Sequence, residues 1–234
     1  MPRIAERAAA PGAALAAALR EAHRTRSLHL LVLLLLPIPF LLVAHQLYFW
    51  DVGPFTSPRW AVNSDRSFIE VLGYAQLAAA AVLLLLRGLR QRGGLAYVGW
   101  AVALTVVALD DALRWHEAGG AWLTRRQLVP EVLSLPQQAL GELVTWVLLG
   151  VPVLLLLAVT HLASSPSVRR DSWLLAALMG VLMLFGAGVD ILHEGIEEVT
   201  DNSVVDLLVT FVEAGGELGA MTALLACAVH VWRR

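Results

Sequence analysis

The sequence predicts an all-α integral membrane bundle of six transmembrane helices, and two observations indicate it. First, 58% of the 234 residues are hydrophobic and the mean hydropathy is +0.69. Second, apolar segments recur along the chain at close to the length of about 20 residues that a helix needs to cross a bilayer. These properties disfavour a soluble globular domain.

The predicted spans are separated by connections rich in Arg, Pro, Ser and Gly, residues that flank or end membrane helices. In chain order the spans are Leu28–Trp50, Phe68–Leu86, Leu95–Leu113, Ala139–Ala163, Trp173–His193 and Val204–Trp232. The first span has too long an apolar core for a cleaved signal peptide and no small-residue cleavage site follows it, so we expect it to remain as an anchor. We therefore predict a cytoplasmic tail over 1–27 and a six-helix transmembrane domain over 28–234.

The arginines indicate the orientation of the chain. All basic residues are arginine, and 12 of the 17 fall on one side of the predicted topology. These are Arg3, Arg7, Arg20, Arg24, Arg26, Arg87, Arg90, Arg92, Arg169, Arg170, Arg233 and Arg234. By the positive-inside rule both termini are cytoplasmic, which fits a multi-pass protein of the bacterial inner membrane.

The acids are distributed in the opposite way. Of the 19 Asp and Glu residues, 16 lie in the outer connections or the outer halves of the spans, and only Glu6, Glu21 and Asp171 are cytoplasmic. A carboxylate inside a span costs about 3 kcal/mol on insertion scales, so it normally faces a partner, a cavity or the bundle interior. The acids within the spans are therefore the candidate functional residues.

Each of the last two spans carries such residues on one helix face. In the fifth span they are Asp190, His193, Glu194 and Glu197, at positions i, i+3, i+4 and i+7. In the sixth span they are Asp206, Thr210, Glu213 and Glu217, at positions i, i+4, i+7 and i+11. Residues at these spacings share one face of a helix, and Glu217 lies about 16 Å along the axis from Asp206.

The third span ends in the stretch "ALDDALRWHE". At about 100° per residue in a continuous helix, Asp110, His116 and Glu117 share one face, whereas Asp111 points elsewhere and is interpreted as a surface or pairing acid. Arg114 either pairs with Asp110 or Glu117 or extends to the membrane interface.

Acids and histidines also recur at a similar interval in successive hairpins. His45 precedes Glu70 by 25 residues, Glu117 precedes Glu142 by 25, and His193 precedes Glu217 by 24. This interval predicts that the bundle is built from repeated helical hairpins.

This residue set indicates a metal site. Carboxylate-bridged di-iron and di-manganese centres in four-helix bundles use single acids from two helices and acid-x-x-His pairs from two others. The expected ligands are Asp110, His116, Glu117, Glu142, Asp190, His193, Glu194, Glu213 and Glu217, with His45, Glu70, Arg114, Glu197 and Asp206 as further candidates. Mixed carboxylate and imidazole ligands favour Fe, Mn or Zn. Cys227 is the only cysteine, which excludes an intrachain disulfide and a thiolate cluster.

The function predicted from this set is a membrane metalloenzyme, an oxidoreductase or a hydrolase, that acts on a lipid-soluble substrate. Its expected partners are the lipid bilayer and that substrate, and no nucleic acid. A mononuclear zinc site on His45, His116 and His193 is the alternative within this class. A carrier that moves divalent cations or protons along the acids is a second alternative, and a structural network of buried ion pairs is a third.

Two of these stretches resemble a known group of proteins. "LDDALRWHE", over Leu109–Glu117, resembles an L-D-[DE]-x4-H-E signature of uncharacterised prokaryotic multi-pass membrane proteins. "EAGGELG", over Glu213–Gly219, is similar to the acidic last helix of the same group. The resemblance implies a membrane protein with a functional HE motif and implies nothing about the substrate.

Overall fold

The computed structural model describes residues 26–130, 137–189 and 203–234, and every regular element in these ranges is helical. Six segments are long and apolar enough to cross a bilayer: Leu28–Phe49, Phe68–Arg90, Leu95–Leu113, Gln137–Leu162, Pro166–Val189 and Val204–Arg233. The prediction of an all-α fold with six helices long and apolar enough to span a membrane is therefore confirmed for the described residues. The largest difference is at the fifth span, which begins at Pro166 instead of Trp173 because its first turns contain charged residues.

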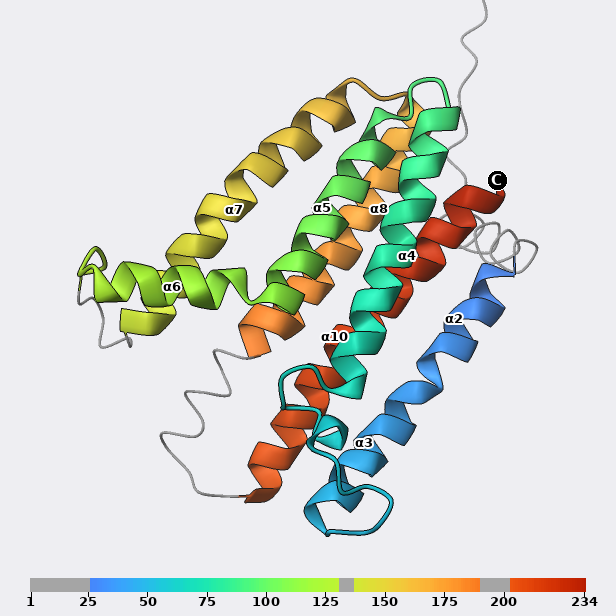
Figure 1. The fold of residues 1–234 in the computed structure, drawn as a ribbon. Coiled ribbons are helices and arrows are strands. Elements are labelled where there is room, and N and C mark those ends of the chain that lie inside the picture. Colours follow the sequence, from blue (N-terminus) through green and yellow to red (C-terminus); the bar gives the residue numbers. More distant parts are fainter. Residues whose placement is uncertain (1–25, 131–136, 190–202) are drawn as a thin grey trace, which may run out of the picture.

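Figure 1 shows the order of the helices along the chain. They are α2 (Ser27–Leu35), α3 (Pro37–Phe49), the short 3-10 helix η1 (Pro58–Trp60), α4 (Phe68–Arg90), α5 (Leu95–Leu113), α6 (Trp115–Arg125), α7 (Gln137–Leu162), α8 (Pro166–Met183), the π-helical turn η2 (Leu184–Val189) and α10 (Ser203–Arg233). The first span consists of α2 and α3, and the second of these begins with a proline, which lacks the N–H that would continue the helical hydrogen bonding.

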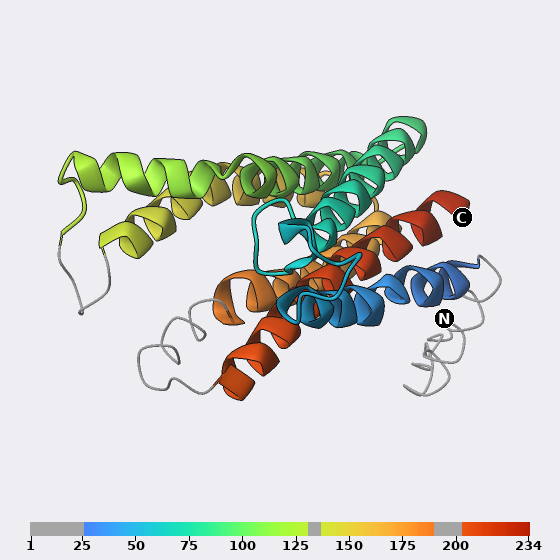
Figure 2. The ribbon, with the colours of Figure 1, turned by 60° about the horizontal axis from the view of Figure 1, so that its bottom comes forward.

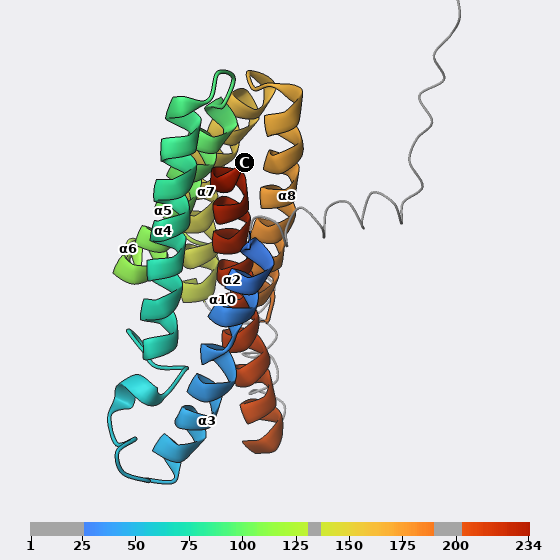
Figure 3. The same ribbon diagram turned by 90° about the vertical axis from the view of Figure 1, so that its right-hand side faces the viewer.

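The helices form two layers, visible in Figures 2 and 3. One layer contains α4 and α5, flanked by α6 and α7, and the other contains α2 with α3, α10 and α8. The layers meet where α4 packs against α10 and α5 packs against α8. Five fully buried leucines fill this contact: Leu77, Leu84, Leu104, Leu175 and Leu224. The core thus lies between the layers along α4, α5, α8 and α10.

The two ends of the bundle differ in charge. At one end the α4–α5 turn meets the α7–α8 turn, where the Ser165 N–H donates to the Gly93 carbonyl oxygen at 3.1 Å. The end of α10 is close by, since the Arg90 guanidinium lies over the Trp232 ring at 4.6 Å. We call this the arginine end. The opposite end, with the connection over 50–67, the end of α5, α6 and the starts of α7 and α10, is the acidic end.

The third predicted span breaks at Arg114. This residue adopts the left-handed conformation, with φ 55° and ψ 44°, so that α5 ends at Leu113 and α6 begins at Trp115. In Figure 1, α6 leaves α5 at an angle and runs beside the start of α7. The assumption of one continuous helix through "ALDDALRWHE" is therefore wrong, and this break decides how the acidic end is arranged.

Candidate functional site

A cavity of about 300 Å³ lies at the acidic end, between α4, α5, α10 and the connection before α4. Its polar lining residues are Asn63, Glu70, Asp111, Thr210, Glu213 and Glu217. Its apolar lining residues are Val62, Ile69, Ala214, Leu218 and Met221. We call this cavity the acid pocket.

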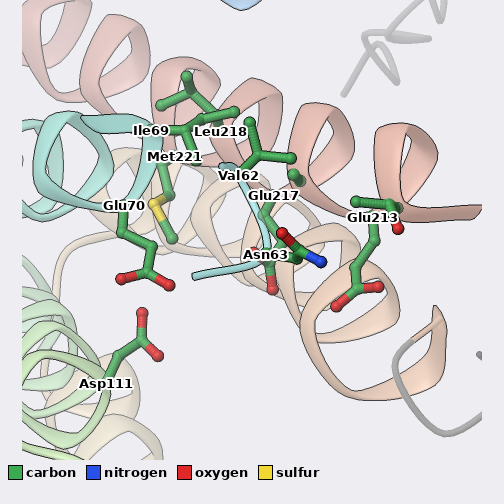
Figure 4. A pocket seen from close by; sticks show the side chains of 11 residues that line it. Val62, Asn63, Ile69, Glu70, Asp111, Glu213, Glu217, Leu218 and Met221 are labelled. Atoms are coloured by element: carbon green, nitrogen blue, oxygen red, sulfur yellow. The ribbon is translucent and has the colours of Figure 1, made fainter. Parts of the chain in front are cut away.

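The four carboxylates of the acid pocket come from three helices. Figure 4 shows the carboxylates of Glu70 on α4 and Asp111 on α5 directed toward one another, with Glu213 and Glu217 on α10 at the other side of the cavity. None of the described residues that line the pocket is basic. Like charges disfavour ionisation of their neighbours, so the four acids influence one another's charge.

Glu70 is anchored by the start of α4. Its Oε2 accepts hydrogen bonds from the Arg66 N–H at 2.6 Å and from the Tyr74 hydroxyl at 3.2 Å. The Ser67 hydroxyl in turn accepts from the Glu70 N–H at 3.5 Å and caps the helix. Glu70 is therefore held by the backbone just before α4 and also lines the pocket, which fixes one wall of the cavity to a helix end.

A second polar cluster lies beside the first, where α5, α6 and α7 meet. The carboxylate of Asp110 accepts three hydrogen bonds there. Oδ1 accepts from the His116 backbone N–H at 3.0 Å, and Oδ2 lies 3.0 Å from His116 Nδ1 and accepts from Trp146 Nε1 at 3.2 Å. The break at Arg114 brings His116 back onto the preceding helix. Asp110 and His116, six residues apart in the sequence, are therefore in direct contact.

Further acids surround this imidazole. Glu117 Oε1 lies 4.0 Å from His116 Nε2, and the Gln138 amide donates to Glu142 Oε1 at 2.6 Å. Burial lowers the pKa of His116, but the hydrogen bond and charge of Asp110, helped by Glu117 and Glu142, outweigh it and raise the pKa above its ordinary value. This set, Asp110, His116, Glu117, Gln138, Glu142 and Trp146, is called the His116 cluster.

Arg114 closes the edge between the two clusters. Its guanidinium pairs with Glu117 and, at 2.5 Å, with Asp65. Of the two interpretations of this residue, pairing with Glu117 is observed, and the second partner is Asp65 instead of Asp110. Nearby carboxylates raise the pKa of Arg114, so it remains charged.

The structure divides the predicted ligand set into two groups. Asp110, His116, Glu117 and Glu142 lie in the His116 cluster, whereas Glu213, Glu217 and Glu70 line the acid pocket. The expectation that one pocket gathers Asp110 with the acids of the last span is therefore wrong for the described residues. Asp110 faces α7 and its capping bonds hold it there.

Asp111, which the sequence analysis set aside, lines the acid pocket. The sequence does contain a signal for it. Tyr97, Trp100 and Leu104 are buried on α5 at spacings that place them on one helix face, and Asp111 continues this face seven residues beyond Leu104. The inward face of α5 thus points at the pocket, and the angular count from Asp110 missed it because it compared only polar residues.

Two further candidates on the first and last spans lie outside the pocket lining. His45 is 3% exposed, its Nδ1 accepts from the Val62 N–H at 3.0 Å, and its ring contacts Phe49 and Phe211. Asp206 is one helical turn before Thr210 on α10. The geometry of His45 is that of a buried residue that ties the first span to the connection before α4.

Asp190, His193, Glu194 and Glu197 lie outside the described residues. Among the residues that the structure does describe, no three His, Cys, Asp or Glu side chains are close enough, as they stand, to hold a metal ion.

Taken together, these features define a helical membrane protein with six potential spans and an acid-lined cavity at one end. Comparison with protein families matches residues 12–231 to a domain of unknown function (DUF8692), and the chain belongs to this family. No curated protein and no solved structure matches the chain.

Proposed function

We propose that this membrane protein binds a divalent cation in the acid pocket. The observation that carries the proposal is that four carboxylates from three helices line one cavity to which no described basic side chain contributes. The ion pairs of Arg114 are with Asp65 and Glu117, outside the pocket lining. A divalent cation bound among the four carboxylates of the pocket would favour their charged form, because an opposite charge stabilises an ionised acid.

The donor atoms favour an oxygen-preferring ion. The pocket offers four carboxylates, the Asn63 amide and the Thr210 hydroxyl, and oxygen-rich sites suit Mg²⁺, Ca²⁺ and Mn²⁺. Of the Fe, Mn and Zn expected from the sequence, Mn²⁺ fits this set best, because the described histidines His45 and His116 make other contacts. A cavity of about 300 Å³ leaves room for an ion that keeps several waters.

The arginines support an orientation with both termini in the cytoplasm. The pocket is at the end of the bundle opposite the arginine end, so in this orientation it is reached from the non-cytoplasmic side. For a bacterial inner-membrane protein, the ion would then come from outside the cytoplasm.

The floor of the pocket favours binding over passage. Leu218 and Met221 close it on the α10 side, and the fully buried Leu77 and Leu224 follow deeper in the bundle. An ion held in a closed-ended pocket is the arrangement of a metal-dependent enzyme, an oxidoreductase or hydrolase, with a lipid-soluble substrate delivered from the bilayer. Cation transport is the weaker alternative, because apolar side chains follow the pocket deeper in the bundle.

The test is Mn²⁺ binding to the full chain purified in detergent, measured by calorimetric titration and metal analysis. We expect about one ion per chain, with Glu217→Gln weakening binding at least about tenfold, equivalent to about 1.4 kcal/mol. Glu117→Gln is the matched control, because its carboxylate pairs with Arg114 outside the pocket lining. Absence of binding, or an equal loss in both variants, contradicts the proposal.

A flux assay in liposomes separates the alternatives. If wild type takes up Mn²⁺ into liposomes and Glu217→Gln does not, the protein is a carrier and the proposal of an ion that stays bound is wrong. Binding without uptake supports the proposal as stated.

A further inference from the structure

Glu217 lies against a glycine of the π-helical turn that ends the fifth span. A Cβ built on Gly186 of η2 would be 2.7 Å from Glu217 Oε1 and 3.7 Å from its Cδ. The preceding residue of each helix makes a second close approach: a Cβ on Gly216 of α10 would be 2.2 Å from Cδ1 of Phe185 in η2. The two helices thus meet through glycines, with one carboxylate and one ring filling the space of the missing side chains.

Gly186 lies within the π-helical turn η2. Its i→i+5 bonding widens the helix locally and changes the direction of the residues that follow, and such turns are common at functional sites. For Gly180, six residues earlier on α8, no atom of another described helix lies within 4 Å of an added Cβ. Close contact is therefore a property of Gly186 and not of every glycine in this span.

We propose that Gly186 is a positioning residue for the acid pocket: its lack of a side chain sets where the Glu217 carboxylate lies and thereby the affinity for the cation. The inference rests on the proposed function, because it concerns the same site. A Cβ at position 186 would lie too close to Glu217 Oε1, so the carboxylate would have to move away from its present position.

This role differs from an ordinary packing role. Within the part of the chain that the structure describes, the atoms of other helices near an added Cβ at Gly186 belong to the carboxyl group of Glu217, the far end of a flexible side chain. An added methyl group therefore displaces the carboxylate and leaves the backbone in place. Alanine also costs less backbone entropy than glycine in a helical segment. Gly186→Ala is thus expected to retain or increase stability without the ion while it weakens ion binding.

The experiment compares Gly186→Ala with Gly180→Ala in the full chain, with Mn²⁺ as the probe. We expect about tenfold weaker Mn²⁺ binding in Gly186→Ala, the effect typical of disturbing a residue that orients a metal ligand, and wild-type affinity in Gly180→Ala. Thermal unfolding in EDTA is measured in parallel, and both variants are expected to unfold no lower than wild type.

A second variant tests whether the effect passes through Glu217. Glu217→Asp shortens the side chain by one methylene and withdraws its carboxylate from position 186. In the Gly186→Ala background this change is expected to restore affinity, so the double variant binds more tightly than the two single effects predict.

The outcomes distinguish the two proposals. If wild type binds Mn²⁺ and Gly186→Ala binds equally well, the positioning role is wrong and the proposed function stands. If Gly186→Ala lowers the unfolding temperature in EDTA and Glu217→Asp does not rescue binding, the glycine has only a packing role. If wild type does not bind Mn²⁺, the proposed function itself fails.

Discussion

The two ends of the bundle hold their inward-facing carboxylates in opposite ways. At the arginine end, Asp171 is 9% exposed, accepts from the Tyr97 hydroxyl at 2.6 Å and pairs with Arg234 at 2.9 Å. Its neighbour Ser172 accepts from the Trp100 indole at 2.8 Å and lies 3.0 Å from His161 Nδ1. At the acidic end, four carboxylates share one cavity.

This difference separates a structural carboxylate from a functional one. A buried acid with a cation and a hydroxyl donor links α5, α8 and the end of α10, and its charge is compensated within the protein. The acid pocket instead gathers like charges, a local cost that folded proteins tend to accept at functional sites. Three predictions test whether the two ends differ in this way.

The largest effect is expected at the arginine end. Asp171→Asn removes the charge that holds both Tyr97 and Arg234 and is expected to destabilise the protein by about 2 kcal/mol. Thermal unfolding in detergent, followed by tryptophan fluorescence, measures this loss. Asp65→Asn is the control, because its pair with Arg114 is exposed and typically contributes at most about 1 kcal/mol. A loss at Asp171 no larger than at Asp65 would show that the network is not structural.

The same substitution in the acid pocket is expected to have the opposite sign. Asp111→Asn removes one of four like charges, so in EDTA it should raise stability by about 1 kcal/mol. The stabilisation that Mn²⁺ gives to wild type should be reduced in this variant, since it has lost a donor. Unfolding with and without Mn²⁺ measures both effects. Destabilisation in EDTA would mean that Asp111 is held by attractive contacts, like Asp171.

The smallest effect concerns the His116 cluster, which lies between these extremes. The raised pKa of His116 means that its pair with Asp110 adds stability that is fully present below the ordinary value of 6.5 and is lost as the pH rises through the raised pKa. The measured quantity is the difference in free energy of unfolding between wild type and His116→Gln. This difference should be larger at about pH 5.5 than at about pH 9, by about 0.5 kcal/mol. An equal difference at both pH values would show that the proton does not contribute.

The sequence by itself determined the number and position of the spans and which residues of the last span share a face. The length and hydropathy of a segment depend only on its own residues. Six apolar segments long enough to span a bilayer can therefore be recognised without knowing how the helices pack. Helical periodicity alone grouped Asp206, Thr210, Glu213 and Glu217. The last three line the pocket, because α10 is continuous through them, whereas Asp206 lies outside its lining.

Only the tertiary structure decided which acids of other helices join them. Helical angles can be counted only within one unbroken helix, and the left-handed backbone of Arg114 ends α5 before His116. Asp110 contacts His116 beyond that break and Trp146 on α7, whereas Asp111, an exposed residue, lines the acid pocket. Contacts such as Gly186 against Glu217 depend on two helices distant in sequence approaching closely, and the spacing of residues within a single helix does not encode that approach.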